Sequence, residues 1–243
     1  ERSSAASDVY KRQVSLGSAE TTLLKITSAY CSFLNGGKLV NPILIDRIQD
    51  SEGKTIFNNE KRFCENCDLI SYEGTSKPII KNKYQQIFSP QTAYQITSML
   101  KGVIERGTGK GLKELKLELA GKTGTTNKNT DTWFIGFTSN LVVGVYIGYD
   151  NPRSLGKFET GSKTAMPVFK EFIKKTANTF NARPFKVADN INMMVIDAKT
   201  GKKANPKTKL AIIESFKKND NKLDNISNNF DSRLNTTNIL KFY

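Results

Sequence analysis

The stretch KTGTTNKNTDTWFIGFTSNLVVGVYIGYD, residues 122–150, decides the fold that we predict for this chain. It contains two apolar runs, residues 131–138 and 141–150, which are separated by two residues. Such a pattern is typical of an antiparallel β-hairpin. Because both runs are apolar on each face, we expect a sheet that helices cover on both sides. The leading Lys-Thr-Gly-Thr should form a strand at one edge of that sheet, where a ligand peptide can pair with it.

Three helical patterns accompany this sheet. The first runs from about residue 19, with Ser18 as its cap, to Gly36–Gly37, and the second starts at Ser89–Pro90 and ends at Gly107. The third is predicted to open at Pro167. The apolar residues expected to face inward are Ala93, Ile96, Met99, Leu100 and Val103 in the second helix, and Val168, Phe169, Phe172 and Ile173 in the third. Together these patterns predict an α+β fold, an α/β sandwich with an antiparallel sheet between helices.

The remaining segments have weaker patterns. Residues 41–58 are predicted to form two strands outside the main sheet, joined by a turn at Ser51–Gly53. Residues 59–83 are polar and are expected to consist mainly of loops. A second Lys-Thr-Gly, residues 199–201, follows a short apolar run and is interpreted as a tight turn. Residues 204–243 are rich in Asn, Lys and Asp, so we expect a mostly disordered tail.

Composition excludes several classes of protein. The chain contains no histidine, which rules out a Ser-His-Asp triad, a Cys-His dyad and histidine zinc sites within it, so acyl chemistry here must use lysine as its base. The net charge is +14, but the basic residues are mostly Lys and spread along the chain, and we expect no nucleic-acid partner. No apolar run approaches the length of a membrane span.

The cysteines give little evidence of chemistry. Cys64 and Cys67 have the spacing of a metal or redox pair, but there is no second pair, so a loop disulfide or free thiols are favoured over a zinc site. Cys31 falls on the apolar face of the first helix and is interpreted as a packing residue. We predict no metal and no cofactor.

From Val14 to about Lys203, an ordered set of segments resembles the C-terminal part of the transpeptidase domain of class A, bifunctional penicillin-binding proteins. Lys-Thr-Gly is one of the motifs of penicillin-binding proteins. The similar segments are residues 15–23, 35–37, 41–42, 48–53, 99–109, 122–125, 133–137, 160–161 and 165–167. The resemblance implies a serine β-lactamase/transpeptidase-like fold that is incomplete here. It also implies that residues 14–178 are the C-terminal portion of the transpeptidase domain and that residues 179–203 are a short strand and turn extension.

In that family the nucleophilic Ser-x-x-Lys and the Ser-x-Asn motif lie upstream of the similar segments, so we expect both to be absent. Pattern matching still finds Ser-x-x-Lys at Ser51/Lys54, Ser98/Lys101, Ser154/Lys157 and Ser215/Lys218. We interpret all four as decoys, although helical spacing could bring the amine of Lys101 to the hydroxyl of Ser98. The isolated chain is therefore expected not to be acylated by a β-lactam.

The N-terminal residues carry a resemblance of a different kind. Residues 8–13, DVYKRQ, resemble the peptide that the transposon end used in sequencing-library preparation encodes in one reading frame. We therefore predict that residues 1–13 are adapter-derived and not native, with a natural basic arm as the alternative.

The resemblance assigns roles to the Lys-Thr-Gly-Thr strand. Lys122 is the catalytic residue in this chain, a cation beside the serines that the chain lacks. Thr123 and Thr125 would offer hydroxyls to the terminal carboxylate of the substrate or of a β-lactam. The N–H of Thr125 would be half of an oxyanion hole. Gly124 would let the substrate lie close to the strand.

The implied function is that of a fragment of a peptidoglycan D,D-transpeptidase, which cross-links stem peptides through an acyl-serine intermediate. Its partners would be peptidoglycan stem peptides, with β-lactams as inhibitors. The full-length protein would be membrane-anchored, with this domain on the periplasmic, extracytoplasmic face of the inner (plasma) membrane. A serine β-lactamase-type hydrolase and a non-catalytic cell-wall-binding module remain as alternatives.

Overall fold

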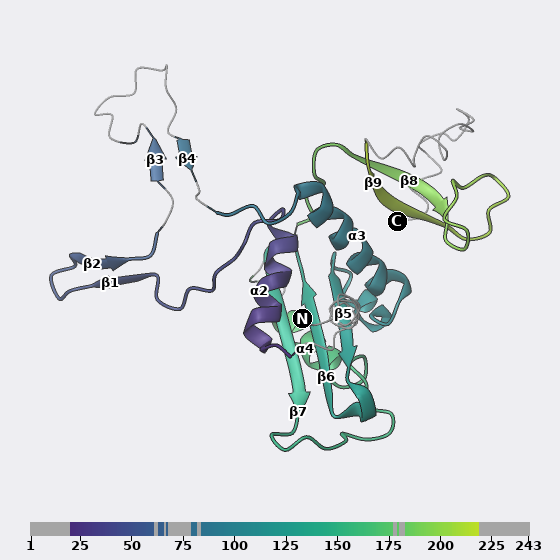
Figure 1. Ribbon diagram of the computed structural model, residues 1–243, viewed down its shortest axis with the longest axis horizontal. Coiled ribbons are helices and arrows are strands. Elements are labelled where there is room, and N and C mark those ends of the chain that lie inside the picture. The colour runs from purple at the N-terminus through teal and green to yellow at the C-terminus, as the bar shows by residue number, and fades with distance from the viewer. Residues whose placement is uncertain are drawn as a thin grey trace, which may run out of the picture.

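The centre of the structure is a three-stranded antiparallel sheet (Figure 1). The computed structural model describes residues 20–60, 63–65, 67, 79–81, 84–176, 179 and 183–218. The strands are β5 (Ala120–Thr125), β6 (Asp131–Phe137) and β7 (Val142–Gly148), in the spatial order β5-β6-β7. The N–H of Thr138 donates to the carbonyl of Leu141 at 2.9 Å, which closes a two-residue turn. The predicted hairpin is confirmed.

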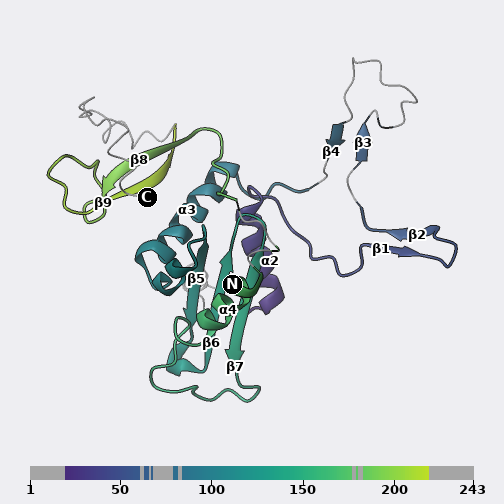
Figure 2. The same cartoon turned by 180° about the vertical axis from the view of Figure 1, so that it is seen from behind.

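Helices cover both faces of the sheet, as predicted (Figures 1 and 2). They are α2 (Leu23–Leu34), α3 (Pro90–Arg106) and α4 (Ala165–Thr176). A Cβ on Gly144 of β7 would lie 2.2 Å from Thr27 Oγ1 in α2, whereas a Cβ on Gly136 of β6 would lie 2.7 Å from the ring of Phe169 in α4. Because Gly144 pairs with the residue before Gly136, these two glycines lie on opposite faces, and so do the two helices.

The core lies mainly between the sheet, α4 and the 3₁₀ helix η1 (Lys110–Leu115). The rings of Phe134 and Phe169 are fully buried, with their centroids 4.8 Å apart. Burying a side chain of this size stabilises a fold by about 1.5–3 kcal/mol. The other members of the cluster are Ile104, Leu112, Leu119, Ala165, Met166 and Ile173. This packing fixes β6, and through it the neighbouring edge strand β5.

The helix boundaries agree with the prediction in part. The N-cap Ser89 Oγ accepts from Thr92 N at 3.2 Å and Gly107 ends α3, as predicted. The predicted cap Ser18 is wrong, because α2 begins at Leu23 and is capped by Thr22, whose hydroxyl accepts from Lys25 N at 3.2 Å. The prediction that Pro167 opens the third helix is also wrong, since α4 begins at Ala165. A proline is tolerated there because the first-turn N–H groups need no helical acceptor.

Three of the helix residues that were predicted to face the core are exposed to solvent instead. Met99 is 62% exposed, Val168 51% and Phe172 43%. In α3 the predicted Ala93 is buried, as are Thr97, Gly102 and Ile104, which were not predicted. The Thr97 hydroxyl donates to the carbonyl of Ala93 at 3.0 Å, so its burial leaves no unpaired group. Three of these four buried residues of α3 have small side chains.

The C-terminal segment corrects a further prediction. Strands β8 (Ile191–Asp197) and β9 (Ala211–Lys217) form an antiparallel pair against α3. The side chain of Gln95 donates to the carbonyl of Ser215 at 3.2 Å, and Lys217 Nζ donates to Thr92 Oγ1 at 2.9 Å. The C-terminal extension therefore continues past residue 203 to residue 218. The prediction of disorder is wrong for residues 204–218, and residues 219–243 lie outside the described residues.

The turn predicted at the second Lys-Thr-Gly is confirmed. It follows β8, where Lys199 N donates to Asp197 Oδ1 at 2.8 Å. Gly201 has a φ of +69°, a left-handed conformation that favours glycine.

A long insertion between α2 and α3 projects from the body (Figures 1 and 2). It contains the paired strands β1 (Arg47–Gln49) and β2 (Thr55–Asn58), joined by the predicted turn, and the pair β3 (Phe63–Glu65) and β4 (Ile79–Lys81). Cys64 and Cys67 form a disulfide, one of the two predicted states. Cys31 lies on α2, half-buried, and burial raises the pKa of its thiol. Within the described ranges, no helix is long and apolar enough to cross a membrane.

Candidate functional site

Strand β5 lies at an edge of the central sheet, as predicted for Lys-Thr-Gly-Thr. Among the described residues it pairs with β6 alone. Lys122 lies opposite Ile135, Gly124 opposite Trp133 and Thr125 opposite Thr132. The other side of β5 therefore offers unpaired backbone groups to a ligand.

The ladder pattern decides which backbone groups point outward. Thr126 N donates to the carbonyl of Asp131 at 3.2 Å, which places a hydrogen-bonded pair immediately beyond β5. In an antiparallel ladder such pairs alternate, so Lys122 and Gly124 also bond to β6. Thr123 and Thr125 then direct their N–H and C=O groups away from β6. The N–H of Thr125 faces the free edge, as an oxyanion donor requires.

The ammonium group of Lys122 lies along the same edge. Its Nζ donates to the carbonyl of Thr123 at 2.8 Å, and that carbonyl is one of the outward-facing groups. Lys122 is exposed, and it forms no ion pair with any carboxylate in the described part of the chain. A positive charge is thus held at the free edge without a fixed counter-charge among these residues.

The hydroxyls of the two threonines have defined partners. Thr125 Oγ1 accepts from the N–H of Gly161 at 3.0 Å, which leaves its own proton free to donate. Thr123 Oγ1 lies 2.9 Å from Thr108 Oγ1. Thr108 follows the end of α3, where the N–H groups of Gly107 and Gly109 both donate to the carbonyl of Val103 at 3.0 Å.

Glycines let two backbone segments meet at β5. A Cβ on Gly161 would lie 2.5 Å from the carbonyl oxygen of Gly124 and 2.6 Å from that of Trp133. The segment that precedes α4 therefore packs directly on the β5–β6 backbone. A Cβ on Gly124 itself would lie 3.0 Å from Trp133 Cβ, so the cross-strand neighbour already favours glycine there.

An aromatic pair adjoins Gly124 on the same face as Lys122. The indole N–H of Trp133 donates to Asp131 Oδ1 at 2.8 Å, and its ring meets Tyr146 edge-on with the centroids 4.6 Å apart. Trp133 is half-buried and Tyr146 is 43% exposed. These rings form a wall beside the strand.

No sequence pattern predicted a role for Thr108, Gly161 or Trp133. All three belong to segments that carry the family resemblance, but neither the segment of Thr108 nor that of Gly161 indicates a contact with β5. In the sequence, Trp133 is one more residue of an apolar strand. The only available signal was the glycine on each side of Thr108, which marks a tight turn at a helix end.

The decoy interpretation of Ser98 and Lys101 agrees with the geometry. Lys101 Nζ lies 2.5 Å from Glu118 Oε1 and 3.8 Å from Glu105 Oε1. Glu118 Oε2 also accepts from Phe185 N at 3.2 Å. The amine of Lys101 is thus directed toward two carboxylates, and no hydrogen bond to Ser98 is among these contacts.

The chain is similar to known proteins over most of its length. The family described as penicillin binding protein transpeptidase domain matches residues 3–174. Penicillin-binding protein 1A of Rickettsia typhi is 43% identical over 206 residues, which cover 84% of this chain and 26% of the relative. Penicillin-binding protein 1A of Pseudomonas aeruginosa is 33% identical over 237 residues, which cover 85% of this chain and 29% of the relative.

A solved structure shares this fold. The crystal structure of penicillin-binding protein 1A from Haemophilus influenzae matches with a TM-score of 0.67 and 32% identity, covering 82% of this chain and 32% of that one. The chain spans about a quarter of the length of the curated relatives it matches.

Proposed function

This chain belongs to the penicillin-binding protein transpeptidase family, and on that premise we propose that it is part of a peptidoglycan D,D-transpeptidase. It supplies the strand that binds substrate and stabilises the oxyanion, and the serine nucleophile lies outside these 243 residues. The observation that supports this most directly is the edge position of β5, with an ammonium group, two hydroxyls and an outward N–H along one side.

The reaction is acyl transfer at the D-Ala-D-Ala end of a stem peptide. The serine hydroxyl attacks the carbonyl between the two alanines and loses its proton to a lysine. The C–N bond breaks, D-alanine leaves with a proton on its nitrogen, and an acyl-serine ester remains. An amine of a second stem peptide then attacks the ester, forms the cross-link and releases the serine.

Lys122 contributes charge to this reaction. Its ammonium lies along the edge where the acyl-D-alanine must bind, held by the carbonyl of Thr123. There it attracts the terminal carboxylate and supports the protonation of the leaving amine. Since its bond to Thr123 is to a neutral carbonyl, the charge remains available to an anionic ligand.

The threonines bind the substrate at two points. The N–H of Thr125 donates to the oxyanion that forms on the attacked carbonyl, and removal of one such donor typically lowers a rate by a factor on the order of 10² to 10³. The hydroxyl of Thr125 accepts from Gly161 N and so donates its proton to the carboxylate. The hydroxyl of Thr123 also donates its proton to the carboxylate when its oxygen accepts a hydrogen bond from the hydroxyl of Thr108.

The same groups explain inhibition by β-lactams, whose ring carbonyl and carboxylate take the places of the peptide carbonyl and the terminal carboxylate. The family match does not favour the β-lactamase-type hydrolase or the non-catalytic wall-binding module. We further propose that the domain works at the periplasmic face of the inner membrane, anchored by parts of the protein outside these residues. It uses no cofactor.

Covalent labelling tests the assignment. In the complete protein that carries this chain, we expect Lys122→Ala to abolish stable labelling by a fluorescent penicillin. Lys199→Ala, in the second Lys-Thr-Gly, is the matched control and should label normally, because Lys199 lies in an exposed turn after β8. Equal labelling of the two variants would contradict the role of Lys122. The isolated chain should not be labelled, and an adduct mapped to Ser98 would show that its nucleophile lies within it.

A further inference from the structure

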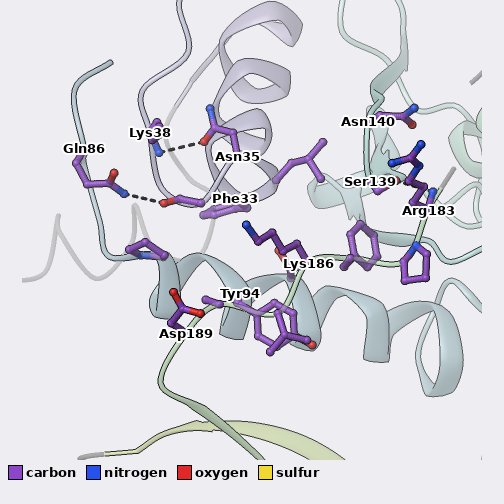
Figure 3. A pocket seen from close by; sticks show the side chains of 18 residues that line it. Phe33, Asn35, Lys38, Gln86, Tyr94, Ser139, Asn140, Arg183, Lys186 and Asp189 are labelled. Atoms are coloured by element: carbon purple, nitrogen blue, oxygen red, sulfur yellow. Dashed lines mark hydrogen bonds between the residues drawn. The ribbon is translucent and has the colours of Figure 1, made fainter. Parts of the chain in front are cut away.

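Figure 3 shows a cavity of about 850 Å³ that is lined by Ser139 and Asn140 of the β6–β7 turn. Because Thr125 pairs with Thr132 at the other end of β6, the cavity lies at the opposite end of the sheet from Thr125. The end of α2, the start of α3, the β6–β7 turn and residues 183–189 form its walls. None of residues 122–125 lines it. It is therefore separate from the site at β5, and a role for this cavity does not depend on the proposed function.

The polar rim of this cavity is mainly positive. Lys38, Arg183 and Lys186 line it, with Asp189 as the acidic residue. None of these three cations forms an ion pair within the part of the chain that the structure describes. Figure 3 shows Lys186 extending into the space between Phe33 and Tyr94, with Arg183 beside Ser139. The first turn of α3 adds the partial positive charge of a helix N-terminus.

The floor of the cavity is aromatic and held in place. Phe33 contacts Phe88 with ring centroids 5.5 Å apart, and Phe185 meets Phe137 of the sheet at 5.6 Å. Both lining rings are thus fixed by packing instead of being free to close the cavity. Val187, 47% exposed, adds apolar surface at the rim.

One wall offers unpaired backbone. Three bonds hold residues 183–189 to the body: from Arg183 N to Ser139 Oγ at 2.8 Å, from Phe185 N to Glu118 Oε2 at 3.2 Å, and from Gln91 Nε2 to the carbonyl of Asp189 at 2.9 Å. No backbone–backbone hydrogen bond among the described residues involves this segment, and it forms neither helix nor strand. The N–H groups of residues 186–188 make none of these bonds, and a segment with free backbone groups can pair with an extended peptide.

We propose that this cavity binds an acidic peptide segment of a partner protein, extended along residues 183–189. The volume is in the range of ligand sites and exceeds what a single inorganic anion would occupy. In an extended peptide, alternate side chains point to opposite sides. Acidic residues can therefore meet the cations of the rim while the apolar residues between them contact the aromatic floor.

Fluorescence anisotropy of the 243-residue chain with a labelled peptide, Asp-Leu-Asp-Phe-Asp-Leu, tests this. Exposed ion pairs are individually weak, but replacing two attractions by two repulsions should lower the affinity about tenfold in Arg183→Glu/Lys186→Glu. The backbone bond of residue 183 to Ser139 survives that change. The matched control is Lys174→Glu/Lys175→Glu at the end of α4, which alters the net charge equally away from the cavity and should change the affinity less than about twofold.

A second pair of variants tests the backbone contact. Ala188→Pro removes an N–H from the wall and should weaken binding several-fold, whereas Ala188→Gly keeps that N–H and should not. Circular dichroism must show the same fold for each variant. The proposal is overturned if the acidic peptide does not bind saturably, or if both charge-reversal variants weaken it equally. It also fails if a peptide with Lys in place of Asp, or an oligothymidylate, binds as tightly as the acidic peptide.

Discussion

Removing the hydroxyl of Thr108 should slow acylation of the complete transpeptidase without unfolding it. Thr108 Oγ1 lies 2.9 Å from Thr123 Oγ1, and Thr123 belongs to the strand that binds the substrate carboxylate in the proposed mechanism. Valine keeps the shape of threonine but cannot hydrogen-bond, so Thr123 would lose the partner that orients its proton. A net hydrogen bond contributes about 0.5–1.5 kcal/mol, which corresponds to a loss of about 2- to 12-fold in rate.

The turn itself should survive this change. The N–H groups of Gly107 and Gly109 both donate to the carbonyl of Val103, so the backbone of the turn does not depend on the side chain of Thr108. We expect the free energy of unfolding of Thr108→Val to stay within about 0.5 kcal/mol of the parent value, as for other surface substitutions. Thermal unfolding followed by circular dichroism measures this directly.

The assay is the second-order rate of acylation by a fluorescent penicillin, measured for Thr108→Val, Thr108→Ser, Thr123→Val and the double valine variant. Serine retains the hydroxyl and should restore most of the rate. If the two hydroxyls act as a unit, the double variant should be little slower than Thr123→Val alone. Equal rates for the valine and serine variants, or fully additive effects of the two valines, would refute a role for Thr108 in positioning Thr123.

Two further predictions concern the wall of the site and the C-terminal extension. Gly161→Ala would place a Cβ 2.5 Å from the carbonyl oxygen of Gly124, and we expect a loss of about 1–3 kcal/mol in stability together with slower acylation. Gly111→Ala is the control, since its Cβ would meet the flexible end of Met166 at 3.1 Å, and a similar loss there would contradict the reasoning. Burial, more than the opposing attraction of Arg106, raises the pKa of Glu214 above its ordinary value of 4.5. The folded state then holds this proton more tightly than the unfolded state, so stability should fall as pH rises from about 4.5 through the raised pKa. Glu214→Gln should reduce that fall in urea unfolding curves, and an unchanged pH dependence would show that burial of this carboxylate is not its cause.

Local patterns in the sequence were sufficient to predict the central part of the fold. The apolar runs of β6 and β7 and the short connection between them determine the hairpin, and Ser89–Pro90 marks the start of α3 by its capping chemistry. Strand β9 was missed because Ala211–Lys217 is a short apolar run within a segment rich in Asn and Lys. Its hydrogen bonds are made to β8 and its packing to α3, and neither partner is visible in a local pattern.

For the candidate site too, local sequence patterns predict the strand but not its contacts with distant segments. The placement of Lys122–Thr125 at a sheet edge follows from the neighbouring hairpin, and the structure confirms it. The contact of Thr108 with Thr123 joins residues that are 15 positions apart, and that of Gly161 with Thr125 joins residues 36 apart. Both depend on how two loops return to the sheet. Periodicity predicts which elements form, but not which loop side chains meet.

In the proposed mechanism the N–H of Thr125 is an oxyanion donor, and such a donor works only when the protein holds it still before the reaction. This N–H belongs to the last residue of β5, where strands tend to fray. The polar segment after β5 supplies the restraint. Thr126 N donates to the carbonyl of Asp131 and Asp131 N donates to Thr126 Oγ1 at 3.0 Å, while Thr126 Oγ1 lies 2.8 Å from Thr130 Oγ1. On the other side, Gly161 N donates to the hydroxyl of Thr125. The run of Thr and Asn between β5 and β6 is therefore more than a solvated connection, because its side chains close the end of the ladder and fix the direction of the Thr125 N–H.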